Sequence, residues 1–263
     1  MSFRSANIAR RATSALMGIV IGLALVGCMS TYATPGAPAD FKAIGVSRES
    51  LTDTSINQTL AKQPLATFPC GIAAVRIQAP GYHSHAADTF GSGNYCVVTT
   101  RNIETDDDWK KLKNLPMVTG IAPLNRLLLP TQLNTDLELR QAAASLHADM
   151  LLIYTIDTTF HVEDHLSPLT VITLGLSPNM SAQVVTTASA VLMDTRNGYL
   201  YGYSEATEHG AQPANGWTSE AAVDAAVKRT ETKAFGKLVD GLQETWGDVI
   251  KNFGGGAKVS AVH

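Results

Sequence analysis

The sequence lacks the short motifs that specify the common enzyme chemistries. It contains no Gly-x-Ser-x-Gly nucleophile elbow, no phosphate-binding P-loop and no Cys-x-x-Cys pair. The stretch "GSG" at residues 91–93 lacks the third glycine and the following helix of a dinucleotide fingerprint. Internal repeats are also missing. The residues therefore predict no cofactor and no particular reaction.

An excess of positive charge is missing too. The chain has 263 residues, of which 20 are Lys or Arg and 23 are Asp or Glu. Proteins that hold nucleic acid or anionic lipid headgroups by charge carry a basic patch or a basic net charge. The acidic balance of this chain therefore predicts no nucleic-acid partner.

The apolar run near the N-terminus is too short for a transmembrane helix, which needs roughly 20 apolar residues. It extends from Ala15 to Gly27 and follows a leader that contains three arginines, a pattern typical of a secretory signal peptide. The run leads into "LVGC" at residues 25–28, which resembles the lipobox of bacterial lipoproteins. The resemblance implies that residues 1–27 are removed and that Cys28 is acylated. The alternative is an ordinary signal peptide with an incidental cysteine.

The lipoprotein resemblance also implies where the protein resides. Met29, and not Asp, follows Cys28, which implies delivery to the outer membrane with the domain facing the periplasm. Residues 28–40 have the small, Pro-containing composition of a tether. We expect a periplasmic domain over residues 41–253 and a flexible, Gly-rich tail over residues 254–263. The membrane is then a partner through the lipid anchor.

Cysteine is scarce, and the count is odd. Acylation of Cys28 leaves Cys70 and Cys96 in an oxidising compartment, where cysteines usually pair. The sequence therefore predicts a disulfide between Cys70 and Cys96. Two separate buried thiols are the alternative, because unpaired cysteine is often buried.

The remaining pattern predicts an α/β (α+β) fold. Segments 71–78, 95–100, 117–124 and 150–160 have the apolar, β-branched composition of strands. Short helices are expected near residues 54–62, at residues 105–116, where Thr105 and Asp108 have capping-box spacing, and at residues 137–148. Asn197-Gly198 favours a hairpin. Apolar residues at helical spacing from residue 219 onward predict a long C-terminal amphipathic helix. We expect one mixed, largely antiparallel sheet packed by helices.

Two segments carry a resemblance to known envelope proteins. "RQAAASLHADMLLIYTI" predicts a helix that leads into a buried strand, and "VVTTASAVLMDTRNGYLYG" predicts a strand that ends at a hairpin. This order, followed by the closing helix, resembles the α/β domain of the curli-secretion lipoprotein. It is also similar to the activator lipoprotein of a penicillin-binding protein and to the amino-terminal domain of the Tol-system translocation protein.

The resemblance implies a non-enzymatic adaptor that binds an envelope protein in assembly or secretion, and it allows a homo-oligomer. Asp149 and Asp194 lie in the matching segments and are therefore candidates for partner contact, with local hydrogen bonding at a strand start and a turn as the alternative. Residues 157–178 are longer than a plain hairpin needs and are a candidate for contacts peculiar to this protein.

Histidines supply the competing hypothesis. His161, Asp164 and His165 resemble the His-x-x-Glu-His motif of inverted zinc peptidases, but Pro168 and the strand-like alternation of the segment favour a loop. His83 and His85 are spaced so that an extended chain would point both the same way, although a solvated loop explains them too. The alternative function is a metal-dependent hydrolase or a small-molecule-binding lipoprotein that uses these loops.

Overall fold

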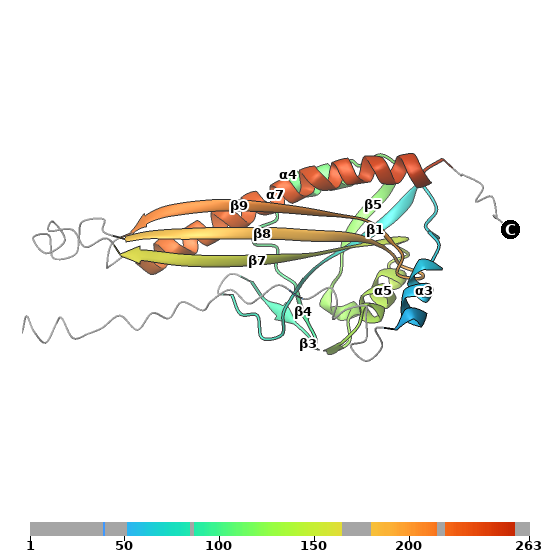
Figure 1. Cartoon of the computed structure of the whole chain (residues 1–263), viewed down its shortest axis with the longest axis horizontal. Helices are drawn as coiled ribbons and strands as arrows, with labels where there is room; N and C mark the ends of the chain where they lie inside the picture. The colour runs from blue at the N-terminus through green and yellow to red at the C-terminus, as the bar shows by residue number, and fades with distance from the viewer. Residues whose placement is uncertain (1–38, 40–51, 85–86, 165–179, 215–218, 256–263) are drawn as a thin grey trace, which may run out of the picture. The chain divides into compact units, whose positions relative to one another are not determined.

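Three strands of 15 residues each form the largest part of a mixed sheet. They are β7 (Met150–Asp164), β8 (Met180–Asp194) and β9 (Leu200–Ala214), and they pair antiparallel in that order. The computed structural model describes residue 39 and residues 52–84, 87–164, 180–214 and 219–255 (Figure 1). All of them belong to the unit Ala33–His263.

The sheet continues on the other side of β7 with β1 (Cys70–Gln78), which runs parallel to it. The outer side of β1 pairs with two strands at different places. Its first half is parallel to β5 (Val118–Pro123), and its last residues are antiparallel to β4 (Cys96–Val98), which pairs with β2 (Thr89–Phe90). The short strands β3 (Ser92–Gly93) and β6 (Gln132–Leu133) form a separate pair.

Three helices begin at capping boxes, of which the one at Thr105 is predicted from the sequence. Thr52, Thr105 and Thr135 precede α3 (Asp53–Leu60), α4 (Asp106–Lys113) and α5 (Asp136–Ser145), and each threonine exchanges hydrogen bonds with the third helical residue. This exchange satisfies two backbone donors that a helix start otherwise leaves unpaired. A 3₁₀ turn, η1 (Arg126–Leu128), lies between β5 and β6.

The two central strands of the sheet, β1 and β7, bury side chains on both of their faces. In β7 the side chains of Met150, Leu152 and Tyr154 join the core under α4 and α7, whereas Leu151 and Ile153 join the core under α5. Successive side chains of a strand point to opposite faces, so a continuous apolar run is what this position in a two-layered core requires.

The C-terminal helix α7 (Ser219–Phe253) is continuous over 35 residues and packs along β9 and β8 (Figure 1). Gly236, Gly241 and Gly247 do not split it. Gly241 allows a close approach, because a Cβ atom there would lie 2.5 Å from the Ser204 Oγ on β9. Among the described residues, no helix is both long enough and apolar enough to cross a membrane.

These elements confirm the predicted fold class: the sheet is mixed and mostly antiparallel, and a long C-terminal helix covers it. Ala39 adds one detail to the predicted tether. It is buried, and its N–H donates to the Thr155 Oγ1 over 3.2 Å. At least one residue of the segment 28–40 therefore packs against the folded domain.

Candidate interaction surface

One face of β7, β8 and β9 is covered by α7, and the opposite face, here called the open face, is most exposed on β9, whereas Thr155 of β7 on that face is buried and contacts Ala39. On β9, Tyr203, Glu205, Thr207 and His209 are exposed, whereas the alternate side chains face α7 and are buried or half-buried. Tyr203 is 78% exposed, which is unusual for a large aromatic side chain and typical of surfaces that bind other molecules.

The open face is polar, and its side chains form rows across the three strands. The register places Asp157, Thr187 and Thr207 in one row and Thr159, Val185 and His209 in the next. Thr187 and Thr207 share a hydrogen bond of 2.9 Å between their Oγ1 atoms, and the Ser189 Oγ donates to the Glu205 carboxylate over 2.8 Å. These hydroxyls and carboxylates are ordered by one another, so the face is a preformed array of hydrogen-bonding groups.

The covered face of the same strands buries a carboxylic acid. The Thr158 hydroxyl donates to the Glu231 Oε1 over 2.9 Å and also shares a hydrogen bond of 3.2 Å with the Thr186 hydroxyl. Burial raises the pKa of Glu231, and the nearby Arg76 guanidinium opposes this shift. This hydrogen bond joins α7 to β7 through polar groups, although apolar side chains are more usual in a buried contact of this kind.

A buried charged cluster lies near the end of β1. Arg76 donates to the Asn102 Oδ1 over 3.1 Å and to the Tyr82 hydroxyl over 3.3 Å, and its Nη1 lies 3.8 Å from the Glu104 carboxylate. The Tyr154 hydroxyl donates to Glu104 over 3.0 Å, and burial raises the pKa of Tyr154. Arg76 and Glu104 are each 1% exposed at the side chain. Because solvent and substrate cannot reach these charges, the cluster is structural.

Asp194 also has a structural role. Its side chain is fully buried and accepts hydrogen bonds from the Leu65 N–H, the Arg196 N–H and the Tyr201 hydroxyl. Asp194 is therefore not available to a partner, which corrects its place among the contact candidates. The local hydrogen bonding of a turn, which was the alternative, accounts for it.

Asp149 bonds within the fold as well, but it remains half-buried. Its carboxylate accepts from the Gly71 N–H over 3.2 Å and from the Arg196 guanidinium over 2.8 Å. The Asp149 carboxylate raises the pKa of Arg196. Contact between Asp149 and a partner stays a prediction.

The predicted disulfide is wrong for this fold. Cys70 and Cys96 are both free and buried. Cys70 begins β1, whereas Cys96 pairs with Gln78 at the other end of the same strand, so eight residues of extended chain, roughly 26 Å, separate the two positions. A disulfide requires Cα atoms within about 7 Å. The alternative of two separate buried thiols fits the structure.

The histidine candidates do not form a metal site in the part of the chain that is described. His161 and Asp164 both lie in β7, whereas the two chelating histidines of such a zinc motif lie on one face of a helix. His83 is exposed. His85 and His165 lie outside the described residues. No group of three or more His, Cys, Asp or Glu that could hold a metal occurs among the described residues.

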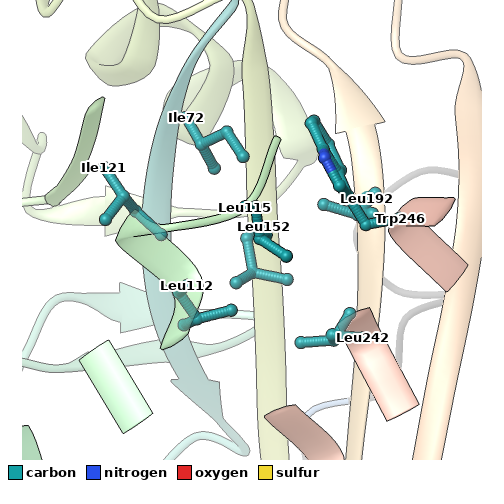
Figure 2. A pocket seen from close by; sticks show the side chains of 8 residues that line it. All are labelled: Ile72, Leu112, Leu115, Ile121, Leu152, Leu192, Leu242 and Trp246. Carbon is teal, nitrogen blue, oxygen red and sulfur yellow. The ribbon is translucent and has the colours of Figure 1, made fainter. Parts of the chain in front are cut away.

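A small cavity lies inside the core between α4, α7 and the sheet (Figure 2). Its volume is about 10 Å³, and the side chains that line it are apolar: Ile72, Leu112, Leu115, Ile121, Leu152, Leu192, Leu242 and Trp246. Pockets for small molecules measure roughly 300 Å³ or more. This cavity is therefore a packing gap and does not hold a ligand.

The open sheet face and the Arg76 cluster were not found from sequence. The first had no local signal, since residues 203–209 contain polar side chains at both odd-numbered and even-numbered positions. A signal for the second was the charged Arg76 within the apolar strand "GIAAVRIQ". Three other segments, at residues 82, 102–104 and 154, complete that cluster, and local patterns do not reveal such neighbours.

The fold and this surface define the molecule as a mixed α/β domain with a polar sheet face that is exposed along β9. No protein-family model and no curated protein matches the chain. Among solved structures, it is similar to a candidate lipoprotein from Caulobacter crescentus, with 15% identity, 45% of this chain and 81% of that chain covered, and a TM-score of 0.25. It is also similar to a DUF330 protein from Xanthomonas campestris, with 12% identity, 73% and 92% covered, and a TM-score of 0.34. Scores this low establish neither a shared fold nor a shared function.

Proposed function

We propose that this protein is a lipid-anchored periplasmic lipoprotein that acts as a non-enzymatic interaction module of the cell envelope. The observation that carries the proposal is the open polar face of β7, β8 and β9, with the exposed Tyr203 at one side of it. A sheet face that is polar, exposed along β9 and bordered by an exposed aromatic residue is suited to binding a macromolecule.

The anchoring part of the proposal rests on the lipobox-like "LVGC" at residues 25–28. The position of Ala39 then limits the distance between the membrane and the domain. Only residues 29–38 separate Cys28 from Ala39, and Ala39 is held by Thr155. Eleven extended residue steps span at most about 40 Å. Acylation of Cys28 would therefore keep the domain, and a partner bound to it, close to the membrane.

Crosslinking in intact cells tests both parts. Tagged protein is purified after crosslinking, and the captured proteins are identified by mass spectrometry for the wild type, Cys28→Ala and Thr207→Lys. Gln243→Lys, at an exposed position of α7, is the matched control for the added charge. We expect a specific envelope partner that is lost with Thr207→Lys, kept with Gln243→Lys and weakened with Cys28→Ala.

Two results would count against the proposal. If Thr207→Lys captures the same proteins as the wild type, the open face is not the binding surface. If Cys28→Ala keeps the membrane localisation and the partner of the wild type, the lipid does not anchor the protein.

A further inference from the structure

The outer edge of β9 presents backbone groups that no strand of the described chain pairs with, and their positions follow from the register. β8 pairs with β7 without a break from Met180 to Asp194, so the N–H and C=O groups of even-numbered and odd-numbered residues of β8 point to opposite neighbours. The Asp194 N–H donates to the Tyr199 carbonyl, on the β9 side. The N–H and C=O groups of the even-numbered residues of β8 therefore point to β9.

The partners of those residues in β9, from Gly202 to Gly210, are also even-numbered. Odd-numbered residues of β9 must then direct their N–H and C=O groups to the outer edge. One contact supports this assignment independently: the Thr245 hydroxyl of α7 donates to the Tyr203 carbonyl over 3.2 Å, as it can only if that carbonyl points away from β8. Within the described chain, β9 pairs with no strand other than β8.

Beyond Tyr203, whose carbonyl bonds to α7, this edge lacks three common devices that prevent pairing with another strand. Edge strands are commonly blunted by lysine, proline or a bulge. The segment "YSEATEHGA" at residues 203–211 contains neither Lys nor Pro, and the only irregularity in the β8 and β9 register lies earlier, at Leu192/Met193. Pro213 follows this segment, where it would end any further pairing.

The exposed side chains of the same segment are complementary to themselves. In an antiparallel pair of two β9 strands centred on Thr207, Glu205 of one copy lies opposite His209 of the other, and the reverse pair forms at the same time. An imidazole N–H can donate to a carboxylate, and opposite pairs on one sheet face contribute to strand pairing. Centring the pair on Glu205 would instead place two carboxylates together. The complementarity of Glu205 and His209 therefore favours Thr207 as the centre.

We propose that two copies of this chain pair antiparallel through their β9 edges, with the two-fold axis at Thr207. The inference rests on the proposed function, of which it names one partner: a second copy. The paired residues 205, 207 and 209 would exchange about six main-chain hydrogen bonds. The two open faces would then join into one continuous polar face, and the two α7 helices would lie on its opposite side.

A symmetric cysteine tests the pairing directly. In the proposed register the Cα atoms of Thr207 in the two copies lie about 5.5 Å apart, which is within the range for a disulfide. The matched control is Thr187→Cys. It removes the same hydrogen bond between Thr187 and Thr207, but it places the new thiol one strand further from the edge in each copy, roughly 14 Å from its counterpart.

Full-length Thr207→Cys and Thr187→Cys proteins are oxidised in membranes and again after detergent purification, and both are analysed on non-reducing gels. We expect most of the Thr207→Cys protein as a reducible dimer and the Thr187→Cys protein as monomer. Monomer for both variants overturns the inference, and dimer for both shows non-specific contact and also overturns it. The purified sample does not depend on Cys28 or on another envelope protein, so its result is separate from that of the proposed function.

The register has its own test, applied to the Thr207→Cys background. His209→Glu would place two carboxylates opposite each other in each pair and should reduce the dimer several-fold. Glu205→His combined with His209→Glu exchanges the two groups and should restore the dimer. If the single and the double variant dimerise to the same extent, the register centred on Thr207 is wrong. Binding of an unrelated extended peptide at this edge, with no dimer, would likewise overturn the inference.

Discussion

The carboxylate of Asp194 accepts a hydrogen bond of 2.9 Å from the hydroxyl of Tyr201. The same carboxylate accepts from the N–H groups of Leu65 and Arg196, each over 2.8 Å. One buried side chain thus joins the end of β8, the start of β9 and the segment before β1. We expect Asp194→Ala to lower the free energy of unfolding by about 2 to 4 kcal/mol, because three donors lose their acceptor. Urea unfolding followed by circular dichroism measures this loss.

Asp248→Ala is the matched control for that experiment. Asp248 is exposed on α7, and surface substitutions usually change stability by no more than about 0.5 kcal/mol. An Asp194→Ala protein as stable as Asp248→Ala would show that the carboxylate does not join these segments.

Replacing one member of the pair Arg76 and Glu104 should lower the free energy of unfolding much more than replacing both. Arg76→Met leaves the buried Glu104 without its cation and should cost about 3 to 5 kcal/mol. The double variant Arg76→Met, Glu104→Gln removes both charges and should recover a large part of that loss. A double-mutant cycle in urea measures the coupling free energy. If the two single effects simply add, the two charges do not interact.

Local sequence signals predict much of the fold. The "TDDDW" segment predicted α4 because Thr105 and Asp108 are three residues apart, and the structure contains both capping hydrogen bonds. The apolar run that begins at Met150 predicted a strand covered on both faces, and β7 is such a strand where it crosses the two cores. These features depend only on neighbours in sequence, so a single sequence reveals them.

Features that depend on distant neighbours were predicted poorly. The cysteine count predicted a disulfide between Cys70 and Cys96, but Cys70 begins β1 whereas Cys96 lies in β4, opposite the other end of β1. Arg76 meets Glu104, and Glu231 approaches the same cluster, only because β1, the segment before α4 and α7 converge. Likewise, nothing local distinguishes the open face of β9 from one that a further helix covers.

Two glycines that lie in different surroundings should respond oppositely to alanine. Nothing lies within 4 Å of a Cβ atom built at Gly247 in α7, so Gly247→Ala should raise stability by up to about 1 kcal/mol through helix propensity. At Gly210 in β9, a Cβ atom would overlap the Thr230 hydroxyl of α7, and Gly210→Ala should lower stability. Thermal unfolding of both variants measures the two signs. Equal shifts would contradict the close contact between α7 and β9.

The unreduced, denatured mature protein should contain two free thiols. Cys70 and Cys96 are unpaired in the fold, and acylation would block the sulfur of Cys28. In the native protein both thiols should react slowly, since burial raises the pKa of Cys70 to about 12 and also raises that of Cys96, and the thiolate is the reactive form. Titration with a thiol reagent gives the counts. No thiols would indicate the disulfide after all, and three would show that Cys28 is not acylated.

The buried Glu231 should make the folded protein less stable as the pH rises. Burial raises the folded-state pKa of Glu231 above its ordinary value, so the stabilising protonated form is fully present below the unfolded-state pKa, about 4.3, and is lost as the pH rises through the folded-state pKa. Glu231→Gln stays neutral at every pH and keeps an oxygen that can accept from Thr158. The free energy of unfolding of the variant should therefore rise relative to that of the wild type between pH 4 and pH 8. The rise should be about 1.4 kcal/mol for each unit by which the pKa is raised. Urea midpoints across this range measure the gain, and the exposed Glu244→Gln on α7 should show none. A constant difference between Glu231→Gln and the wild type would mean that the buried carboxyl titrates as it does in the unfolded chain.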